Sequence, residues 1–202
     1  MIAGGPGVYT GAFRPADHGL GGPLVHAEAR LGGACLLRGC IPSKALLQAA
    51  ELTHLVREAG AAGLVYERGE FDIDKLRTWS EGIVDRLSSG LSHLCERRGI
   101  HLIQGRARFE GSVRASIEGA EVDTVRFRHA IIATGSAPRL PSGFDIGDER
   151  IIDSTGALAL RAVPARLLVL GGGYVGLEMG SVDAPLGRAG PPVPRGTQLQ
   201  TR

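Results

Sequence analysis

Long apolar runs, cysteines and an excess of one charge are all scarce in this chain. No apolar run approaches the roughly 18 residues of a membrane span, so no span is expected. No basic stretch precedes an apolar one at the N-terminus, so no secretory signal is predicted. Three cysteines are too few for a disulfide scaffold. A net charge of only +2 argues against binding to nucleic acid or to an anionic membrane.

Glycine, by contrast, is abundant. The chain has 31 glycines in 202 residues, about twice the usual share. The remaining composition, with 43% hydrophobic and 22% charged residues, is that of an ordinary globular protein. The length corresponds to about one to one and a half domains. The positions of the glycines are therefore the informative feature.

Apolar spacing predicts two long helices in the first half of the chain. One follows Pro42 and Ser43 and ends at Gly60. The other runs from about residue 72 to residue 98. Before them, the N-terminus predicts almost no strand, and Pro15 opposes the helix expected after the first turn. The apolar face of the second long helix is expected to hold Leu76, Trp79, Ile83, Leu87, Leu91 and Leu94.

Strands are expected mainly in the second half. Three short β segments begin at His101, Ser112 and Val122, and a buried strand, AIIAT, follows them. Another strand, RLLVL from Arg166, leads into a glycine-rich run. The residues from Asp183 onwards hold four prolines and show no helix or strand period, so we predict that they are mostly disordered.

The most distinctive local signal is the pair Cys35 and Cys40 within GGACLLRGCIPSK. Two thiols this close can cycle between dithiol and disulfide, and the dipole of the helix that starts after Cys40 favours a thiolate. The spacing is equally compatible with two structural cysteines. Half of a metal site is a further alternative, although a metal site needs a second pair and only Cys95 remains. Cys95 itself is predicted to be an ordinary core residue.

A second signal is Gly171-x-Gly173-x-x-Gly176, which follows RLLVL and opens an apolar helix. In that setting the first glycine permits a tight turn and the second lets the backbone approach a pyrophosphate. The third allows close packing of helix on strand. A plain strand–helix turn without a nucleotide is the alternative.

A weaker copy of this pattern opens the chain, in register at Ala3, Gly5 and Val8. Ala3 suits the turn only with a negative φ, and Val8 places two methyl groups where the helix should approach the strand. The acidic residue expected about 20 positions later to hold a ribose is Glu28. His26, at the ungapped position, is expected to be a partly exposed residue at a strand end. The region is interpreted as a damaged nucleotide site.

Four stretches together resemble the flavin-dependent pyridine nucleotide–disulfide oxidoreductases. They are LGGACLLRGCIPSKALL, AIIATGSAPRLP, DSTGALAL and RLLVLGGGYVGLEMGS, and the resemblance covers nearly all of residues 1–187. Within the family the similarity is greatest to the dihydrolipoamide dehydrogenases, with mercuric reductases as the alternative. The resemblance implies an α/β fold of FAD/NAD(P)-binding Rossmann-like domains with a small three-stranded β meander, both domains being incomplete.

The resemblance also implies a domain organisation and a reaction. Residues 1–150 would form an FAD-binding domain with a redox disulfide, residues 151–182 the start of an NAD-binding domain, and residues 183–202 a tail. Electrons would pass from dihydrolipoamide, or from a lipoyl-bearing protein, through Cys35 and Cys40 and FAD to NAD. A reducing compartment suits a cycling dithiol, so a cytoplasmic location is expected.

The resemblance assigns roles to individual residues. Cys35 would exchange with the substrate, Cys40 would lie against the flavin, and Lys44 would pair with Glu178 beside the reactive edge of the flavin. No metal ligand is implied. The implied FAD-binding residues are Gly5, Gly7, Glu28, Gly33, Lys44, Gly105, Ala107, Thr134, Gly135 and Ser136, and the implied NAD-binding residues are Gly171, Gly173 and Gly176.

Other readings of the chain stay open at this point. The resemblance ends near Asp183, before the family's C-terminal domain, which supplies a catalytic base and forms the homodimer. The chain therefore looks like an N-terminal fragment that would not form that homodimer. An inactive truncated product is one alternative, and a binding module that uses only the dithiol is another.

Overall fold

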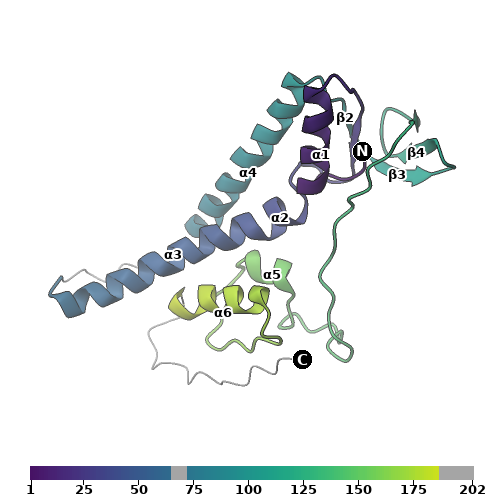
Figure 1. Ribbon diagram of the computed structural model, residues 1–202. Coiled ribbons are helices and arrows are strands. Elements are labelled where there is room, and N and C mark those ends of the chain that lie inside the picture. The colour runs from purple at the N-terminus through teal and green to yellow at the C-terminus, as the bar shows by residue number, and fades with distance from the viewer. Residues whose placement is uncertain (65–71, 187–202) are drawn as a thin grey trace. The chain divides into compact units, whose positions relative to one another are not determined.

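The computed structural model describes residues 1–64 and 72–186. The chain divides into two compact units (Figure 1). The first consists of Met1–Arg38 and Val84–Ala137, and the second of Gly39–Ile83 and Pro138–Arg202. This grouping follows backbone contacts, and the division between cofactor domains near residue 150 stays a prediction.

A short parallel sheet lies in the first unit. β1 (Leu24–His26) pairs in parallel with β2 (Leu102–Gln104). Ile2 forms one parallel bridge with Val25 and another with Ile132. At the N-terminus, strand-like pairing is therefore limited to Ile2, in agreement with the prediction of almost no strand there.

The buried strand predicted for AIIAT is wrong. Only Ile132 pairs, through its bridge to Ile2, and its side chain is 60% exposed. A strand needs a partner of similar length, and here the partner is one residue long. The apolar character of the segment alone does not reveal this.

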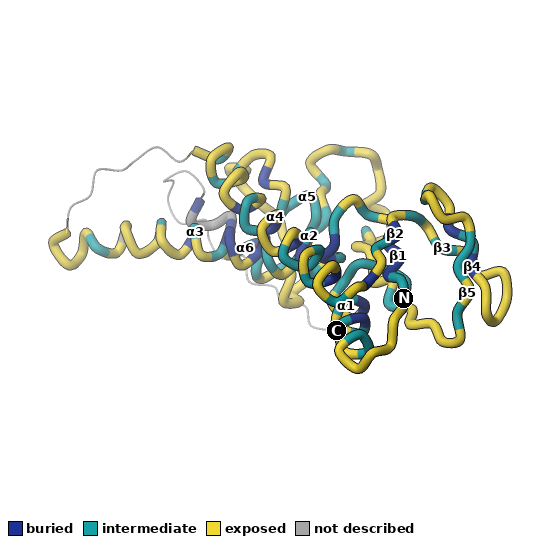
Figure 2. The backbone as a smooth tube through the Cα atoms, turned by 90° about the horizontal axis from the view of Figure 1, so that it is seen from above, coloured by how far each residue is buried: buried dark blue, intermediate teal, exposed yellow. Residues whose placement is uncertain are grey.

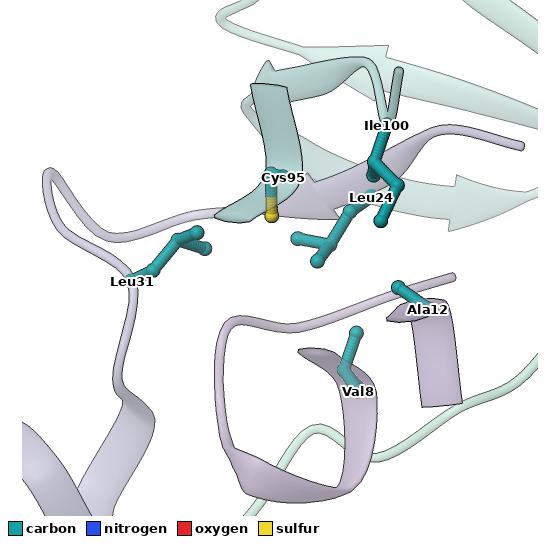
Figure 3. Packing of buried hydrophobic residues seen from close by; sticks show 6 residues of the cluster. All are labelled: Val8, Ala12, Leu24, Leu31, Cys95 and Ile100. Carbon is teal, nitrogen blue, oxygen red and sulfur yellow. The ribbon is translucent and has the colours of Figure 1, made fainter. Parts of the chain in front are cut away.

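Helix α1 (Pro6–Asp17) forms even though Pro15 lies inside it. Pro15 is in the last turn, where its carbonyl accepts hydrogen bonds from the N–H groups of His18 and Leu20 at 3.0 and 2.9 Å. Val8 is completely buried in the core of the first unit, where Figure 3 shows it on the same side of α1 as Ala12, towards Leu24. Val8 is therefore a packing residue, and the expectation that it would obstruct the helix is wrong.

Ala3 has a positive φ, the conformation that the sequence pattern identifies as unfavourable for alanine at this turn. Its φ is 119°, in the region that favours glycine, and its N–H donates to the carbonyl of Val25 at 2.8 Å. Ala3 therefore does not have the negative φ that would let an alanine fit this turn without strain. The first turn therefore forms at the cost of backbone strain at Ala3.

The three-stranded meander is present in the first unit, as the sequence predicts. β3 (Arg106–Phe109), β4 (Arg114–Glu118) and β5 (Thr124–Arg126) form an antiparallel sheet in the order β3-β4-β5. Its apolar face packs on β1 and β2, because Ile117 lies in one buried cluster with Val25 and Ile103. This packing places the start of β3 beside the end of β1.

Helix α4 (Ile73–Arg97) forms where the spacing predicts it and passes from the second unit into the first. Its buried residues include Ser80, Val84, Ser88 and Cys95, whereas Trp79 and Leu87 are exposed. In the middle of α4, the buried face is therefore shifted by about one residue from the predicted apolar face, so this part of the prediction is wrong. Two small serines let the helix pack closely, and the Oγ of Ser88 donates to the carbonyl of Leu31 at 2.7 Å.

The second unit is helical in its described part. α3 (Cys40–Ala59) is capped by Gly60, as predicted, and continues into η1 (Gly60–Ala62). α5 (Ser154–Leu158) and α6 (Tyr174–Leu186) follow. Figure 2 shows that the C-terminal half of α3 is largely exposed. A buried cluster joins α3 to α6 and is formed by Leu46, Ala50, Leu160, Val182 and Leu186.

Two expectations for the second unit fail. The segment RLLVL forms no strand, and Leu168 within it is 82% exposed. No neighbouring strand is present in residues 138–186 to pair with it. The predicted disordered tail begins too early, because α6 continues through Leu186. The rest of that tail lies outside the described residues.

Replacing Ala3 by glycine should stabilise the chain. Relief of the positive φ gains about 1–2 kcal/mol, and the greater freedom of glycine in the unfolded chain costs about 0.5–1 kcal/mol. We expect a net gain of about 0.5–1 kcal/mol, measured as a higher urea midpoint. Ala16→Gly, within α1, is the control and should lower the midpoint. A midpoint for Ala3→Gly as low as that of the control would contradict the strain at Ala3.

Candidate functional site

A pocket of about 860 Å³ lies within the first unit. This volume is within the range of about 300–1,000 Å³ that is typical of ligand sites. It is called the glycine-lined pocket below. Five stretches line it: residues 2–7, residues 25–28, residues 33–35 with Arg38, residues 105–107 and residues 133–136.

The floor of the pocket is a close approach of two backbone segments. Gly33 has a φ of 61°, and a Cβ at this position would lie 2.5 Å from the Cα of Gly5. The N–H of Gly32 donates to the carbonyl of Gly4 at 2.7 Å and holds the segments together. Gly5 is also the N-cap of α1. The turn therefore presents the positive end of a helix dipole to the pocket, which suits an anionic group.

Two further glycines allow close contacts in the pocket walls. A Cβ at Gly105 would lie 2.6 Å from the Cγ2 of Ile117, and the N–H of Gly105 donates to the carbonyl of His26 at 2.8 Å. A Cβ at Gly7 would lie 3.3 Å from the Cβ of Ala133. These glycines therefore allow the segments that line the pocket to pack closely against one another.

Charged residues lie at one side of the pocket. Glu28 and Arg38 both line it and form an ion pair at 2.5 Å between Oε1 and the guanidinium. His26 ends β1, as predicted, but it is only 7% exposed, so the expectation of a partly exposed residue is wrong. Its Nδ1 lies 2.8 Å from the carbonyl oxygen of Glu28. The buried ring thus braces the turn that carries the carboxylate.

The pocket brings together most of the residues that the resemblance implies for FAD. Lys44 is the exception, because it belongs to the second unit. Sequence reasoning missed Arg38 and Arg106, which also line the pocket. A cation within the redox segment could have drawn attention to Arg38. The implied residues that line the pocket are Gly5, Gly7, Glu28, Gly33, Gly105, Ala107, Thr134, Gly135 and Ser136.

The three cysteines differ in state. Cys35, in α2 (Gly33–Arg38), and Cys40, at the start of α3, are both disulfide-bonded. Cys95 is free and completely buried in the core of the first unit, beside Leu24 and Leu31 (Figure 3). Burial raises the pKa of the Cys95 thiol above its ordinary value. The prediction that Cys95 is a core residue is confirmed.

An ion pair joins α3 to α6 in the second unit. The ammonium of Lys44 donates to the Oε1 of Glu178. This hydrogen bond is the main cause that lowers the pKa of Glu178, and a hydrogen bond from Ser43 contributes as well. Ser43 is buried, and its Oγ also lies 3.2 Å from the carbonyl oxygen of Cys40. The pair that the resemblance implies is therefore formed.

The glycine run before α6 forms a tight turn. Gly171 has a φ of 106°, and a Cβ at Gly176 would lie 2.4 Å from the carbonyl oxygen of Gly171. The carbonyl of Gly173 accepts from the N–H of Leu177 at 3.1 Å. The turn thus has the close contacts that its glycines predict, although the strand before it is not formed.

Residues 1–64 and 72–186 contain neither a cluster of metal ligands nor a helix that could span a membrane. No three His, Cys, Asp or Glu residues lie together there in a way that could hold a metal ion. Within the same ranges, every helix is too short or too polar to cross a membrane.

The chain is similar to a set of curated dihydrolipoyl dehydrogenases. It is 44% identical over 191 residues to dihydrolipoyl dehydrogenase 2 of Haloarcula marismortui and 42% identical over 189 residues to dihydrolipoyl dehydrogenase of Buchnera aphidicola. In both cases the match covers 93% of this chain and 40% of the relative. The chain therefore spans about 40% of the length of these relatives.

A solved structure has a similar fold. The HOCl-induced flavoprotein disulfide reductase RclA from Escherichia coli matches with a TM-score of 0.77 and 27% sequence identity, over 92% of this chain and 39% of that one. The family described as pyridine nucleotide-disulphide oxidoreductase matches residues 1–194. With a glycine-lined pocket, a disulfide-bonded Cys35 and Cys40, and a family match along nearly its whole length, this chain belongs to the pyridine nucleotide-disulphide oxidoreductases.

Proposed function

We propose that the chain supplies the FAD-binding region and the redox disulfide of a flavoprotein that oxidises dihydrolipoyl groups. The observation that carries the proposal is the glycine-lined pocket, which gathers residues from five separate stretches of the first unit. Its volume and its glycine floor fit an extended dinucleotide. The similarity to dihydrolipoyl dehydrogenases supports the substrate class.

The pocket residues divide naturally along a dinucleotide. Gly5 and Gly7, at the start of α1, would face the pyrophosphate. Glu28 would accept hydrogen bonds from a ribose diol, because a carboxylate offers two acceptor oxygens. The backbone of Gly105 and Ala107 would lie against the adenine. Bound FAD would supply an acceptor for an electron pair.

The segment Thr134–Ser136 would close the remaining side of the pocket. Gly135 has a φ of 75°, and no atom would lie within 4 Å of a Cβ placed on it. Its conformation, rather than crowding, is therefore what favours glycine there. Thr134 and Ser136 flank it and add two hydroxyl groups to the pocket lining. Both can donate hydrogen bonds to a bound dinucleotide.

The two disulfide-bonded cysteines would carry the exchange with substrate. A thiolate of the dihydrolipoyl group would attack the Sγ of Cys35, form a mixed disulfide and release Cys40 as a thiolate. The second substrate thiol would then attack the substrate sulfur, which closes the lipoyl disulfide and frees Cys35. Two electrons move to the cysteine pair, and the substrate gives up two protons.

Glu178 would hold the positively charged ammonium of Lys44 in a defined position within the second unit. The hydrogen bond between them holds Glu178 ionised and limits the freedom of the Lys44 side chain. Gly171, Gly173 and Gly176 would receive the pyrophosphate of NAD at the start of α6. A dithiol that must cycle suits a reducing compartment, so we place the protein in the cytoplasm.

Flavin binding tests the proposal directly. We expect the chain to bind FAD, measured by quenching of flavin fluorescence and by equilibrium dialysis. Gly33→Ala should weaken binding at least about tenfold, or about 1.4 kcal/mol, because the added Cβ would collide with Gly5. Gly63→Ala is the matched control, since Gly63 also has a positive φ but faces open space. Failure of the unchanged chain to bind FAD, or equal binding by Gly33→Ala, would contradict the proposal.

Thiol exchange can be measured without flavin. Incubation with dihydrolipoamide should reduce the cysteine pair and release lipoamide, and mass spectrometry after alkylation should find labels on Cys35 and Cys40. Cys40→Ser should release no lipoamide, because it lacks the disulfide. Cys95→Ser, which alters only the buried free thiol, should react like the unchanged chain. Release of lipoamide by Cys40→Ser in stoichiometric amounts would exclude the exchange step.

The pair of Lys44 and Glu178 should give a pH-dependent stability. Because the pKa of Glu178 is lowered on folding, the pair stabilises the chain above the ordinary carboxyl pKa, and this contribution is lost as pH falls through the folded value. Lys44→Met should reduce the free energy of unfolding at pH 7 by less than about 1 kcal/mol, since the pair is partly exposed.

A double-mutant cycle with Glu178→Gln isolates the pairwise contribution of Lys44 and Glu178. The coupling energy, taken from urea unfolding, should be favourable at pH 7 and vanish in strong acid. A coupling energy that does not change between these two conditions would mean that the ion pair is not its source.

A further inference from the structure

One edge of the meander carries three arginines. Arg114 lies directly opposite Arg126 across β4 and β5, and Arg128 follows two residues later. Like charges opposite each other in a sheet are destabilising. Arg114 pairs with Glu110 at 3.0 Å, whereas Arg126 and Arg128 have no ion pair among the described residues. The three arginines, with Val113 and Phe127, are called the arginine edge.

The backbone of β5 is open on its outer side. The N–H of Ile117 donates to the carbonyl of Asp123 at 2.9 Å, and the N–H of Phe127 donates to that of Val113 at 3.0 Å. Hydrogen bonds to β4 therefore involve every second residue of β5, and the backbone groups of Thr124 and Arg126 point away from β4. β5 is the last strand in the order β3-β4-β5, so this side can accept another strand.

A hollow adjoins the open edge. It has a volume of about 350 Å³ and is lined by Val113, Arg126, Phe127 and Arg128. The four residues belong to the first unit, and Figure 2 labels the strand β5 beside which they lie. Val113 and Phe127 supply apolar surface on one face of the sheet, while Arg114 and Arg126 belong to the other face. The edge therefore offers different chemistry on its two faces.

We propose that the arginine edge binds an extended acidic segment of another protein as an added β-strand. Side chains two residues apart in a strand are about 6.6–6.8 Å apart and share a face. An Asp or Glu of the added strand can therefore meet Arg126, the last residue of β5, while the neighbouring apolar residues face Phe127 and Val113. A second acidic residue can meet the long side chain of Arg128, which follows in a bend. This surface lies apart from the proposed thiol chemistry and does not depend on it.

Charge and chemistry favour a polypeptide over nucleic acid. The whole chain has a net charge of only +2, so it lacks the overall basic charge that is typical of proteins that bind nucleic acid. Phe127 lies on the face opposite Arg126, so it is poorly placed to stack a base whose phosphate Arg126 holds. An open backbone edge is matched by the N–H and C=O groups of a peptide strand.

A synthetic peptide of about seven alternating Glu and Val residues tests the proposal. We expect it to bind the full chain, with weaker binding as salt increases. The double variant Arg126→Gln with Arg128→Gln should bind it about tenfold more weakly, because two exposed ion pairs are lost. Arg86→Gln with Arg97→Gln, on α4, makes the same change in net charge and should stay within about twofold of the unchanged chain.

Hydrogen exchange supplies a readout of strand addition itself. The peptide should slow exchange of the Arg126 amide, which points outwards, and leave the Val125 amide, which already faces β4, almost unchanged. Equal binding of a peptide with Gln in place of Glu would overturn the proposal. So would protection of amides only at other places, tighter binding of oligodeoxythymidylate than of the peptide, or a dimer of the chain that the Arg126→Gln, Arg128→Gln variant abolishes.

Discussion

The contact between Gly5 and Gly33 is the constraint on which the first unit depends. The start of α1 and the start of α2 approach so closely that a single methyl group at Gly33 would lie 2.5 Å from the Cα of Gly5. The hydrogen bond from Gly32 to Gly4 and the hydrogen bond from Ser88 to Leu31 hold the second segment in place. One wall of the pocket and the first cysteine of the redox segment are therefore positioned by the same backbone contact.

Around this contact, strain and packing are balanced against each other. Ala3 is held in an unfavourable conformation, but its N–H and the bridges of Ile2 tie the first turn to β1 and to Ile132. Val8 offsets part of that cost by filling the core between α1 and β1. The turn is thus kept by tertiary contacts even though its own residues do not favour it. A glycine pattern with Ala3 and Val8 in place of two glycines can therefore still form the tight turn into a helix that the intact pattern forms.

Sequence reasoning predicted the local elements better than their partners. The long helices, the meander and the burial of Cys95 follow from periodicity and composition. The strands expected at AIIAT and RLLVL fail because a strand is stable only beside another strand, and the length of that neighbour is not written in the segment itself. The buried face of α4 was misplaced for a related reason: Ser80 and Ser88 are buried because they are small and, for Ser88, because a carbonyl accepts its hydroxyl. Gly5 and Glu28 were identified from the opening glycine pattern and the other pocket glycines from the resemblance, whereas Arg38, although it lies within the redox segment, was identified only from its position in the pocket.

The single-residue bridges of Ile2 have a consequence for how the first unit is made. They join the second residue of the chain to Val25 and to Ile132, and the pocket is lined by residues from Ile2 to Ser136. During synthesis Ile2 leaves the ribosome well before Ser136, so one wall of the pocket is made long before the last one. Contacts between such distant positions form slowly, because the long intervening loop must close before any gain is made. The meander can form early from contacts between neighbouring strands, whereas the short helix α1 needs its packing against Leu24. The pocket is therefore expected to be among the last parts of the unit to assemble.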